Sequence, residues 1–306
     1  MGTTLTGGET STLCYIYKNG DGPSTFINGG THGGEITYPV FRKLAAHLEK
    51  HEFKGKITLL PVSNPIAWSQ RLYFSTAGKF SMYDGKDWNW RYPGNADGVV
   101  QERFAHMVFT EVVQHDFVID LHTSRWSKPF LITGKSEHLP LAKASGIDYT
   151  YASLDAHDLK GTNIMPLSYA ADMHCKNGGV TLECGSHDSM NDAVFEYCYK
   201  VVLNMLVFQG HFDDYIPLSN GMYYTGYHTY TAPEAGFVEY HHAFWDTVKA
   251  GEVLYTLYPA NDLKRKVEII AKADCLVAKY QPTHIAQPGD QVVMTVPTDQ
   301  LHLYSQ

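Results

Sequence analysis

The sequence contains no run of apolar residues that approaches the ~18 needed for a membrane-spanning helix. Its first residues, 1–5, also lack the basic segment and apolar core that mark a secretory signal peptide. We therefore expect a cytoplasmic protein that makes no contact with a membrane.

Cysteine is scarce, and its five copies show no Cys-x-x-Cys spacing. An odd number without paired spacing argues against a disulfide framework and against a structural zinc cluster. We expect the cysteines to behave as small apolar side chains. They are Cys14, Cys175, Cys184, Cys198 and Cys275.

The chain has no concentration of basic charge. Its 24 Lys and Arg residues are scattered and are outnumbered by 32 Asp and Glu residues, which gives a net charge of −8. This argues against a nucleic-acid-binding protein. With 44% hydrophobic residues over 306 positions, the chain is long enough for one large globular domain and a smaller one, at about 100–200 residues per domain.

Three segments near the N-terminus predict a strand, a helix and a second strand. Residues 24–27 form a short apolar run, residues 38–51 place apolar side chains at the spacing of one helical face, and residues 56–62 form a second apolar run. This order is a βαβ unit, which favours an α/β fold with a mainly parallel sheet flanked by helices.

Two further apolar runs, residues 117–123 and 179–185, predict buried strands that end in polar side chains. Helical spacing returns in residues 99–114 and 190–208, whereas residues 64–94 are rich in aromatic, Gly and Pro residues and predict a long binding loop. In open α/β sheets, ligands bind at the carboxyl ends of the strands. We therefore expect a site where these strands end.

The character of the sequence changes near residue 220. Short β-rich runs separated by Gly, Pro, Asn and Asp follow, at residues 236–240, 253–257, 266–270, 275–278 and 291–296. We therefore predict one domain over residues 1–220 and a small all-β domain over residues 221–306.

The segment from Asn28 to Glu35 reads Asn-Gly-Gly-Thr-His-Gly-Gly-Glu and places His32 three residues before Glu35, between a predicted strand and a predicted helix. Zinc sites with two His ligands and one Glu ligand leave a fourth position for water, so His32 and Glu35 could be two of three ligands. Taken alone, the motif fits a solvated Gly-rich turn equally well. A third ligand and a base would decide between the two interpretations.

A set of motifs in the expected order resembles the succinylglutamate desuccinylase/aspartoacylase family, which shares its fold with zinc carboxypeptidases of the carboxypeptidase A type. The motifs are His32-x-x-Glu35, Arg71 after Asn64-Pro65, Asn89, Asp120-Leu-His122-Thr and Thr181-Leu-Glu183. The resemblance implies that residues 1–220 form a zinc hydrolase catalytic domain. The C-terminal part is similar to the small β domain of the family.

The resemblance implies a zinc-dependent amidohydrolase with one zinc ion per chain, a deacylase that cleaves the amide bond of an N-acyl amino acid or a related small amide. It assigns His32, Glu35 and His122 as metal ligands, Glu183 as the catalytic base and Arg71 as the arginine that stabilises the oxyanion. Zinc would lower the pKa of its bound water toward ~7. Glu183 would take the proton of that water and pass it to the leaving amine.

Residues near these ligands are expected to orient them or to bind substrate. Asp120 lies two residues from His122 on the same face of a strand, and we predict that it orders that ligand. Asn89, Arg91 and Arg125 are predicted to bind substrate.

One segment departs from the family. Family members commonly read Asp-Leu-Asn-Arg-x-Phe-Pro-Gly, in which the Arg holds the α-carboxylate of the substrate, whereas residues 87–94 read Asp-Trp-Asn-Trp-Arg-Tyr-Pro-Gly. Trp90 thus occupies the place of that Arg. Arg91, Arg125 and Lys128 are the cations that we expect to supply positive charge instead.

Two other functions fit the sequence. The shared fold allows a zinc carboxypeptidase that acts on short peptides. The β domain, which resembles a biotinyl/lipoyl-type barrel, allows a non-catalytic module that binds a partner. With any of these functions, the protein could form a homo-oligomer. A non-catalytic protein would not need all of His32, Glu35, His122 and Glu183, which favours the deacylase.

Overall fold

The computed structural model describes residues 2–3, 9–72, 75–124, 126–154, 164–187, 191–218, 221–262, 264–281 and 283–304, and of residues 2, 3, 9, 71 and 75 it describes the backbone alone. The chain divides into two compact units. Met1–Thr123 and Pro129–Gly221 form the first, called unit 1, and Ser124–Lys128 and Met222–Gln306 form the second, called unit 2.

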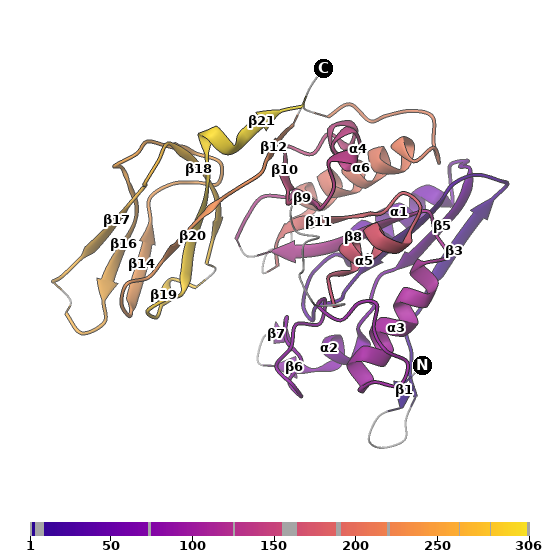
Figure 1. Ribbon diagram of the computed structural model, residues 1–306, viewed down its shortest axis with the longest axis horizontal. Helices are drawn as coiled ribbons and strands as arrows, with labels where there is room; N and C mark the ends of the chain where they lie inside the picture. The colour runs from indigo at the N-terminus through magenta and orange to yellow at the C-terminus, as the bar shows by residue number, and fades with distance from the viewer. Residues whose placement is uncertain are drawn as a thin grey trace. The chain divides into compact units, whose positions relative to one another are not determined.

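A mixed β-sheet forms the centre of unit 1 (Figure 1). Its strands are β3 (Tyr15–Asn19), β4 (Ser24–Gly29), β5 (Gly55–Leu60), β8 (Phe117–Ser124), β9 (Phe130–Thr133), β10 (Tyr149–Ala152) and β11 (Gly179–Ser186). They lie in the spatial order β10-β9-β11-β8-β4-β5-β3. β4 is parallel to β5 and β8, and β9 is parallel to β10, whereas β3 is antiparallel to β5 and β11 is antiparallel to β9.

The neighbouring strands β8 and β11 run in the same direction. Near their starts, the Val118 N–H donates to the Gly178 carbonyl at 3.0 Å. At their far ends, Thr123 Oγ1 lies 3.2 Å from His187 Nδ1. The carboxyl ends of β8 and β11 therefore lie at the same edge of the sheet, together with that of β4, which is parallel to β8.

Helices cover both faces of this sheet. Successive strand side chains point to opposite faces, and in β4 Phe26 belongs to a buried apolar cluster with residues of α3 (Val100–Val112) and α5 (Leu167–His174). A Cβ at Gly29 would instead meet the Phe41 ring of α1 (Tyr38–Leu48). α1 therefore lies on the opposite face from α3 and α5. There it packs against α6 (Asp192–Phe208), which also contacts α4 (Leu139–Ser145).

Local sequence explains how α6 begins. The side-chain oxygen of Asn191 accepts hydrogen bonds from the N–H groups of Ala193 and Val194, which satisfies backbone donors that the first turn leaves free. The predicted long loop over residues 64–94 contains short elements as well. Unit 1 also includes β1 (Gly2–Thr3), β2 (Glu9–Thr10), α2 (Pro65–Ser69), β6 (Arg71–Leu72), β7 (Ser75–Thr76) and η1 (Ser136–His138).

Unit 2 is built from antiparallel strands, drawn in orange to yellow in Figure 1. Its strands and one short helix are β12 (Met222–Tyr224), β13 (His228–Thr231), β14 (Gly236–Tyr240), β15 (Thr247–Val248), β16 (Val253–Pro259), β17 (Val267–Ile270), β18 (Cys275–Tyr280), β19 (Ile285–Ala286), β20 (Gln291–Pro297), η2 (Thr298–Gln300) and β21 (Leu301–Leu303). One sheet has the order β13-β20-β18-β15 and another the order β17-β16-β14-β19. Buried residues of both sheets share one apolar cluster, against which Trp126 also packs.

The predicted fold class is confirmed. A mixed, partly parallel sheet flanked by helices is accompanied by separate antiparallel sheets at the C-terminal end. In the part of the chain that the structure describes, no helix has the length and apolar character needed to cross a membrane.

His211 is a fully buried titratable group at the edge of this core. Its Nδ1 atom donates to the Lys54 carbonyl at 2.7 Å, and its Nε2 atom lies 2.8 Å from the Thr25 hydroxyl of β4. Because Nδ1 must carry a proton to bond a carbonyl, a neutral ring accepts the Thr25 hydroxyl proton at Nε2. Burial lowers the pKa of His211 below its ordinary 6.5 and outweighs the Lys54 carbonyl and the Asp116 charge, which raise it.

This arrangement predicts a loss of stability in acid. The unfolded chain takes up a proton at His211 before the folded chain does, so this contribution to the free energy of unfolding is present above pH 6.5 and is lost as the pH falls through the lowered pKa. The slope contributed by one such proton is at most about 1.4 kcal/mol per pH unit. Chemical denaturation of wild type and His211→Gln between pH 5 and pH 8 should therefore show a smaller slope in the variant. Thr25→Val, which removes the hydroxyl but keeps the histidine, is the control for a general loss of stability, and equal slopes in wild type and His211→Gln would contradict the account.

Candidate metal centre

The loop between β4 and α1 presents His32 and Glu35. Its backbone turns through Gly30 at a φ of +66°, a conformation that glycine adopts without strain. At Gly33 a Cβ would lie 1.6 Å from the Ala77 carbonyl oxygen, so a side chain cannot be accommodated there. The glycines of this motif therefore allow a tight turn that packs closely against the segment around residue 77.

Glu35 connects the two histidines. Its Oε1 atom lies 2.7 Å from His32 Nδ1, and its Oε2 atom lies 2.9 Å from His122 Nδ1. All three side chains are buried, and one potential ligand atom of each lies within 4.8 Å of the others. His122 comes from β8, the strand beside β4. The cluster can therefore hold one metal ion at the common edge of the two strands.

A second carboxylate lies behind each imidazole ring. His32 Nε2 is 2.9 Å from Asp87 Oδ1, and His122 Nε2 is 2.9 Å from Asp120 Oδ2. Because an ionised carboxylate can only accept, each ring donates its Nε2–H outward. The Nδ1 atoms then face the oxygens of Glu35, a contact that is favourable only with a proton or a cation between the two atoms. Outer carboxylates that fix the tautomer in this way are usual around metal-binding histidines.

The electrostatics of the cluster follow from the same contacts. Burial alone would lower the pKa of His122, but Asp120 and Glu35 raise it well above its ordinary value. The pKa of His32 is raised as well, because Glu35 and Asp87 overcome the effect of its burial. Burial would raise the pKa of Glu35, but the two histidines lower it far below its ordinary value. A metal ion must therefore displace protons from this cluster, so metal affinity should rise with pH.

Glu183 lies in β11, the strand next to β8. Its Oε2 atom is buried and has no hydrogen-bond partner among the residues that the structure describes. Glu183 is not one of the three residues whose ligand atoms cluster within 4.8 Å. Its strand ends at the same edge of the sheet as β8, which carries His122. The pKa of the Cys184 thiol is raised first by a hydrogen bond with Cys198 and by burial, and also by the charges of both Glu183 and Glu35.

The loop before α3 brings Asn89 and Arg91 to different places. Asn89 Nδ2 lies 3.3 Å from His122 Nε2, and Asn89 Oδ1 accepts a hydrogen bond from the Leu167 N–H at 3.1 Å. Arg91 is 3% exposed and donates from both terminal nitrogens to the Asp84 carboxylate, at 2.9 and 2.7 Å. This arginine lowers the pKa of Asp84 strongly. Asn89 thus contacts a predicted metal ligand, His122, whereas Arg91 pairs with Asp84 within its own loop.

The other predicted cations are placed only in part. The backbone of Arg71 lies in β6, and its side chain, like the whole of Arg125, lies outside the described residues. Lys128 is exposed and belongs to unit 2. Trp90, which stands at the family's Arg position, is 42% exposed.

The sequence motifs assign no role to two residues near the centre, Asp87 and His187. Asp87 belongs to the segment 87–94, and only its position two residues before Asn89 suggests a function. His187 follows Glu183 by four residues and contacts Thr123, whose N–H donates to Glu35 Oε2 at 3.2 Å. Both join the network around the ligands through contacts that are distant in sequence.

Comparison with known families decides the affiliation of the chain. The model of the succinylglutamate desuccinylase/aspartoacylase catalytic domain matches residues 21–209. The chain belongs to this family. The match includes the segments that carry His32, Glu35, His122 and Glu183.

Individual relatives agree with this affiliation. An N-α-acetyl-L-2,4-diaminobutyric acid deacetylase of Halomonas elongata is 34% identical over 112 residues, which are 35% of this chain and 30% of the relative, so the match spans about a third of that protein. A structure from this family from Shewanella amazonensis superposes with a TM-score of 0.86 at 20% identity and covers 99% of this chain and 98% of its own. The product-bound ectoine utilization protein EutE (DoeB) of Ruegeria pomeroyi superposes with a TM-score of 0.79 at 22% identity, and the match covers 93% of this chain and 88% of that protein's chain. These structural matches establish the fold.

The contact between Asp87 and His32 predicts an effect on metal affinity. Asp87→Asn keeps the size of the side chain but removes the charge that holds the His32 Nε2–H. Zinc affinity, measured by competition with a chelator, should fall by ~10- to 100-fold, the usual effect of losing such a partner. Asp97→Asn, an exposed change in the same region of the chain, should leave the affinity unchanged. If both variants bind zinc as wild type does, Asp87 does not orient His32.

Proposed function

We propose that this protein is a zinc-dependent deacylase that hydrolyses the amide bond of an N-acyl amino acid or a related small amide. The observation that carries the proposal is the buried cluster of His32, Glu35 and His122, in which both Nδ1 atoms face the carboxylate of Glu35. Membership of the desuccinylase/aspartoacylase family supports the same chemistry.

The side chains of the cluster fit one zinc ion per chain. Two imidazole nitrogens and one carboxylate oxygen are a common ligand set for catalytic zinc and leave a coordination position for water. The outer carboxylates Asp87 and Asp120 would keep both rings in the orientation that binding requires. A bound zinc ion would supply Lewis acidity at the scissile carbonyl and lower the pKa of the attacking water.

Glu183 is the proposed general base. Its buried Oε2 atom, which no described residue engages, is available to accept a proton from the attacking water. As the C–N bond breaks, the same carboxyl group returns that proton to the nitrogen of the leaving amine, and the products are a carboxylate and an amine. We assign to Arg71 the role of donating to the oxygen that gains negative charge in the tetrahedral intermediate, a stabilisation typically worth ~10²- to 10³-fold in rate.

The proposed substrate is a small N-acyl amino acid. The name of the Halomonas elongata relative, a deacetylase of an acetylated diaminobutyric acid, supports this class. Arg91 is held by Asp84, and Trp90 stands where the family has an Arg, so we propose that Arg125 binds the carboxylate of the substrate. Asn89, whose amide lies beside His122, is the proposed neutral contact.

The role of Glu183 can be separated from that of a ligand. Glu183→Gln keeps the shape of the side chain but cannot accept the proton, so the purified variant should retain about one zinc ion per chain while kcat falls by ~10²- to 10⁴-fold. His122→Ala should instead lose zinc and activity together. Metal analysis and assay on a panel of N-acyl amino acids and dipeptides provide both readouts. Loss of zinc from Glu183→Gln would make Glu183 a ligand, and preference for dipeptides would favour the carboxypeptidase.

The two arginines should differ in their effects on substrate binding. Arg125→Ala should raise KM for an N-acyl amino acid by ~10-fold or more, because a charge-assisted hydrogen bond contributes about 1.5–3 kcal/mol, and should change KM little for the corresponding neutral amide. Arg91→Ala should change kcat/KM for both substrates by the same factor, because it acts through the loop. Lys128→Ala, which removes a different positive charge three residues after Arg125, is the control for a general effect of charge on KM. A selective effect of Arg91→Ala on the charged substrate would make Arg91 the carboxylate-binding group.

A further inference from the structure

Asn28 is the first residue of the Gly-rich motif, and none of the roles assigned above falls on it. It lies near the end of β4, four residues before His32, and its side chain is fully buried. Asparagine is uncommon at such a position, because a buried polar group costs free energy unless it forms hydrogen bonds. The contacts of its amide group therefore indicate why an amide is present there.

Asn28 lies directly beside Asp120. The two residues are register partners on the parallel strands β4 and β8. Both side chains point to the face of the sheet that carries α3 and α5, since Phe26 and Val118, two residues before them, belong to the apolar cluster of that face. Asn28 Nδ2 lies 2.7 Å from Asp120 Oδ1. Because an ionised carboxylate can only accept, the amide nitrogen of Asn28 donates this hydrogen bond.

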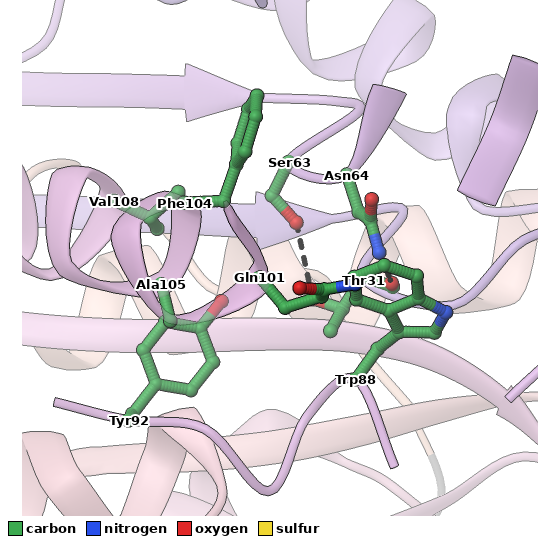
Figure 2. Close-up of a pocket in the computed structure, with 9 residues that line it drawn as sticks. All are labelled: Thr31, Ser63, Asn64, Trp88, Tyr92, Gln101, Phe104, Ala105 and Val108. Carbon is green, nitrogen blue, oxygen red and sulfur yellow. Dashed lines mark hydrogen bonds between the residues drawn. The ribbon is translucent and has the colours of Figure 1, made fainter. Parts of the chain in front are cut away.

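The second hydrogen of the same amide nitrogen is directed to Thr31. Asn28 Nδ2 lies 3.0 Å from Thr31 Oγ1. Thr31 has further contacts, because its Oγ1 atom lies 3.1 Å from Ser63 Oγ and its carbonyl accepts a hydrogen bond from Asn64 Nδ2 at 3.0 Å (Figure 2). A reversed amide would place the Asn28 oxygen against an oxygen of Asp120. The orientation of the Asn28 amide is therefore fixed by both of its acceptors.

Asp120 accepts hydrogen bonds at both of its oxygens. Oδ1 accepts from Asn28, and Oδ2 accepts from His122 Nε2 at 2.9 Å. The last torsion of an aspartate side chain has only broad preferences, so a carboxylate held at one oxygen can turn, whereas one held at both oxygens keeps a single plane. The plane of the Asp120 carboxylate in turn sets the direction of the His122 ring, whose Nδ1 atom faces Glu35.

The outer carboxylate of the other histidine is held differently. Asp87 Oδ1 accepts from the Asn89 N–H at 2.8 Å as well as from His32, and Asp87 Oδ2 lies 3.4 Å from the Lys79 ammonium group. Asp120 is fully buried, and a lysine there would bring another charge into the core at a high cost. An asparagine supplies a neutral donor instead, which orients the carboxylate and leaves its negative charge facing the imidazole.

We propose that Asn28 is a positioning residue of the metal centre, which fixes the plane of the Asp120 carboxylate and, through it, the orientation of His122. The hydrogen bonds of Asn28 do not depend on any reaction, whereas their effect on metal affinity rests on the zinc site of the proposed function. Asn28 is one hydrogen bond further from the metal than Asp120, so its removal should cost less affinity than the removal of a direct partner of a ligand.

Zinc affinity, measured by competition with a chelator, tests this role. Asn28→Leu, which has a similar shape and no donor, should weaken zinc binding by roughly threefold to tenfold, less than the ~10- to 100-fold typical of a direct partner of a ligand. Thr25→Val is the matched control, because it removes another buried hydrogen bond from the same strand and should leave zinc affinity unchanged. Asn28→Thr, which suits a strand and offers one donor in place of two, replaces Asn28→Leu if that variant does not fold. Wild-type affinity in the folded Asn28 variant would overturn the proposal.

A double-mutant cycle separates this role from a general effect on the strand. In an Asp120→Ala background, Asn28 has no carboxylate to orient, so Asn28→Leu should change zinc affinity there by less than about twofold. An equal loss of affinity in the wild-type and Asp120→Ala backgrounds would show that Asn28 acts by another route, and the proposal would then be wrong.

Hydrogen exchange in the protein without zinc distinguishes a failure of this proposal from a failure of the proposed function. By NMR, the His122 Nε2–H proton should exchange with water more rapidly in Asn28→Leu than in wild type, and at the wild-type rate in Thr25→Val. Equal rates in wild type and Asn28→Leu would mean that Asn28 does not hold the Asp120–His122 pair. A wild-type protein that binds no zinc would refute the proposed function, while the exchange rates would still decide the role of Asn28.

Discussion

The carboxylate of Glu35 is the interaction on which the candidate centre depends. Each of its two oxygens faces an imidazole Nδ1, and the opposite side of each ring is held by Asp87 or Asp120. Three carboxylates in a buried place require compensating positive charge, since burying unpaired charge is costly. Two protons on the histidines, or one divalent cation between them, provide the same charge of +2. A divalent metal ion can therefore replace the two protons without changing the net charge of the site.

The loop before α3 stabilises this centre through its own internal contacts. Its turn is closed by the Ser81 N–H donating to the Lys86 carbonyl at 2.9 Å and by the paired Arg91 and Asp84. A further backbone hydrogen bond, from the Trp88 N–H to the Lys79 carbonyl at 3.0 Å, also lies within this loop. Asp87 and Asn89 can therefore be held at definite positions near His32 and His122.

Much of the fold could be predicted because periodicity reports which face of an element is buried. The helix at residues 38–51 and the strands at residues 24–27 and 56–62 correspond to α1, β4 and β5, and the β-rich runs after residue 220 correspond to strands of unit 2. The path of a loop is not encoded in such a pattern. The pairing of Asp87 with His32, 55 residues apart in sequence, and the capture of Arg91 by Asp84 depend on backbone turns that no local propensity specifies. For the same reason, no local pattern indicates that residues 124–128 group with unit 2.

That last feature limits how the protein can be divided. Trp126 packs against the apolar cluster of unit 2, and its carbonyl accepts a hydrogen bond from the Tyr280 N–H at 3.0 Å. The β unit is therefore not a C-terminal module that one cut in the chain can remove. Shortening the protein after residue 221 would deprive Trp126 of the residues that bury it, only four positions after His122. Exchanging β units between relatives would therefore require residues 124–128 to be transferred together with residues 222–306.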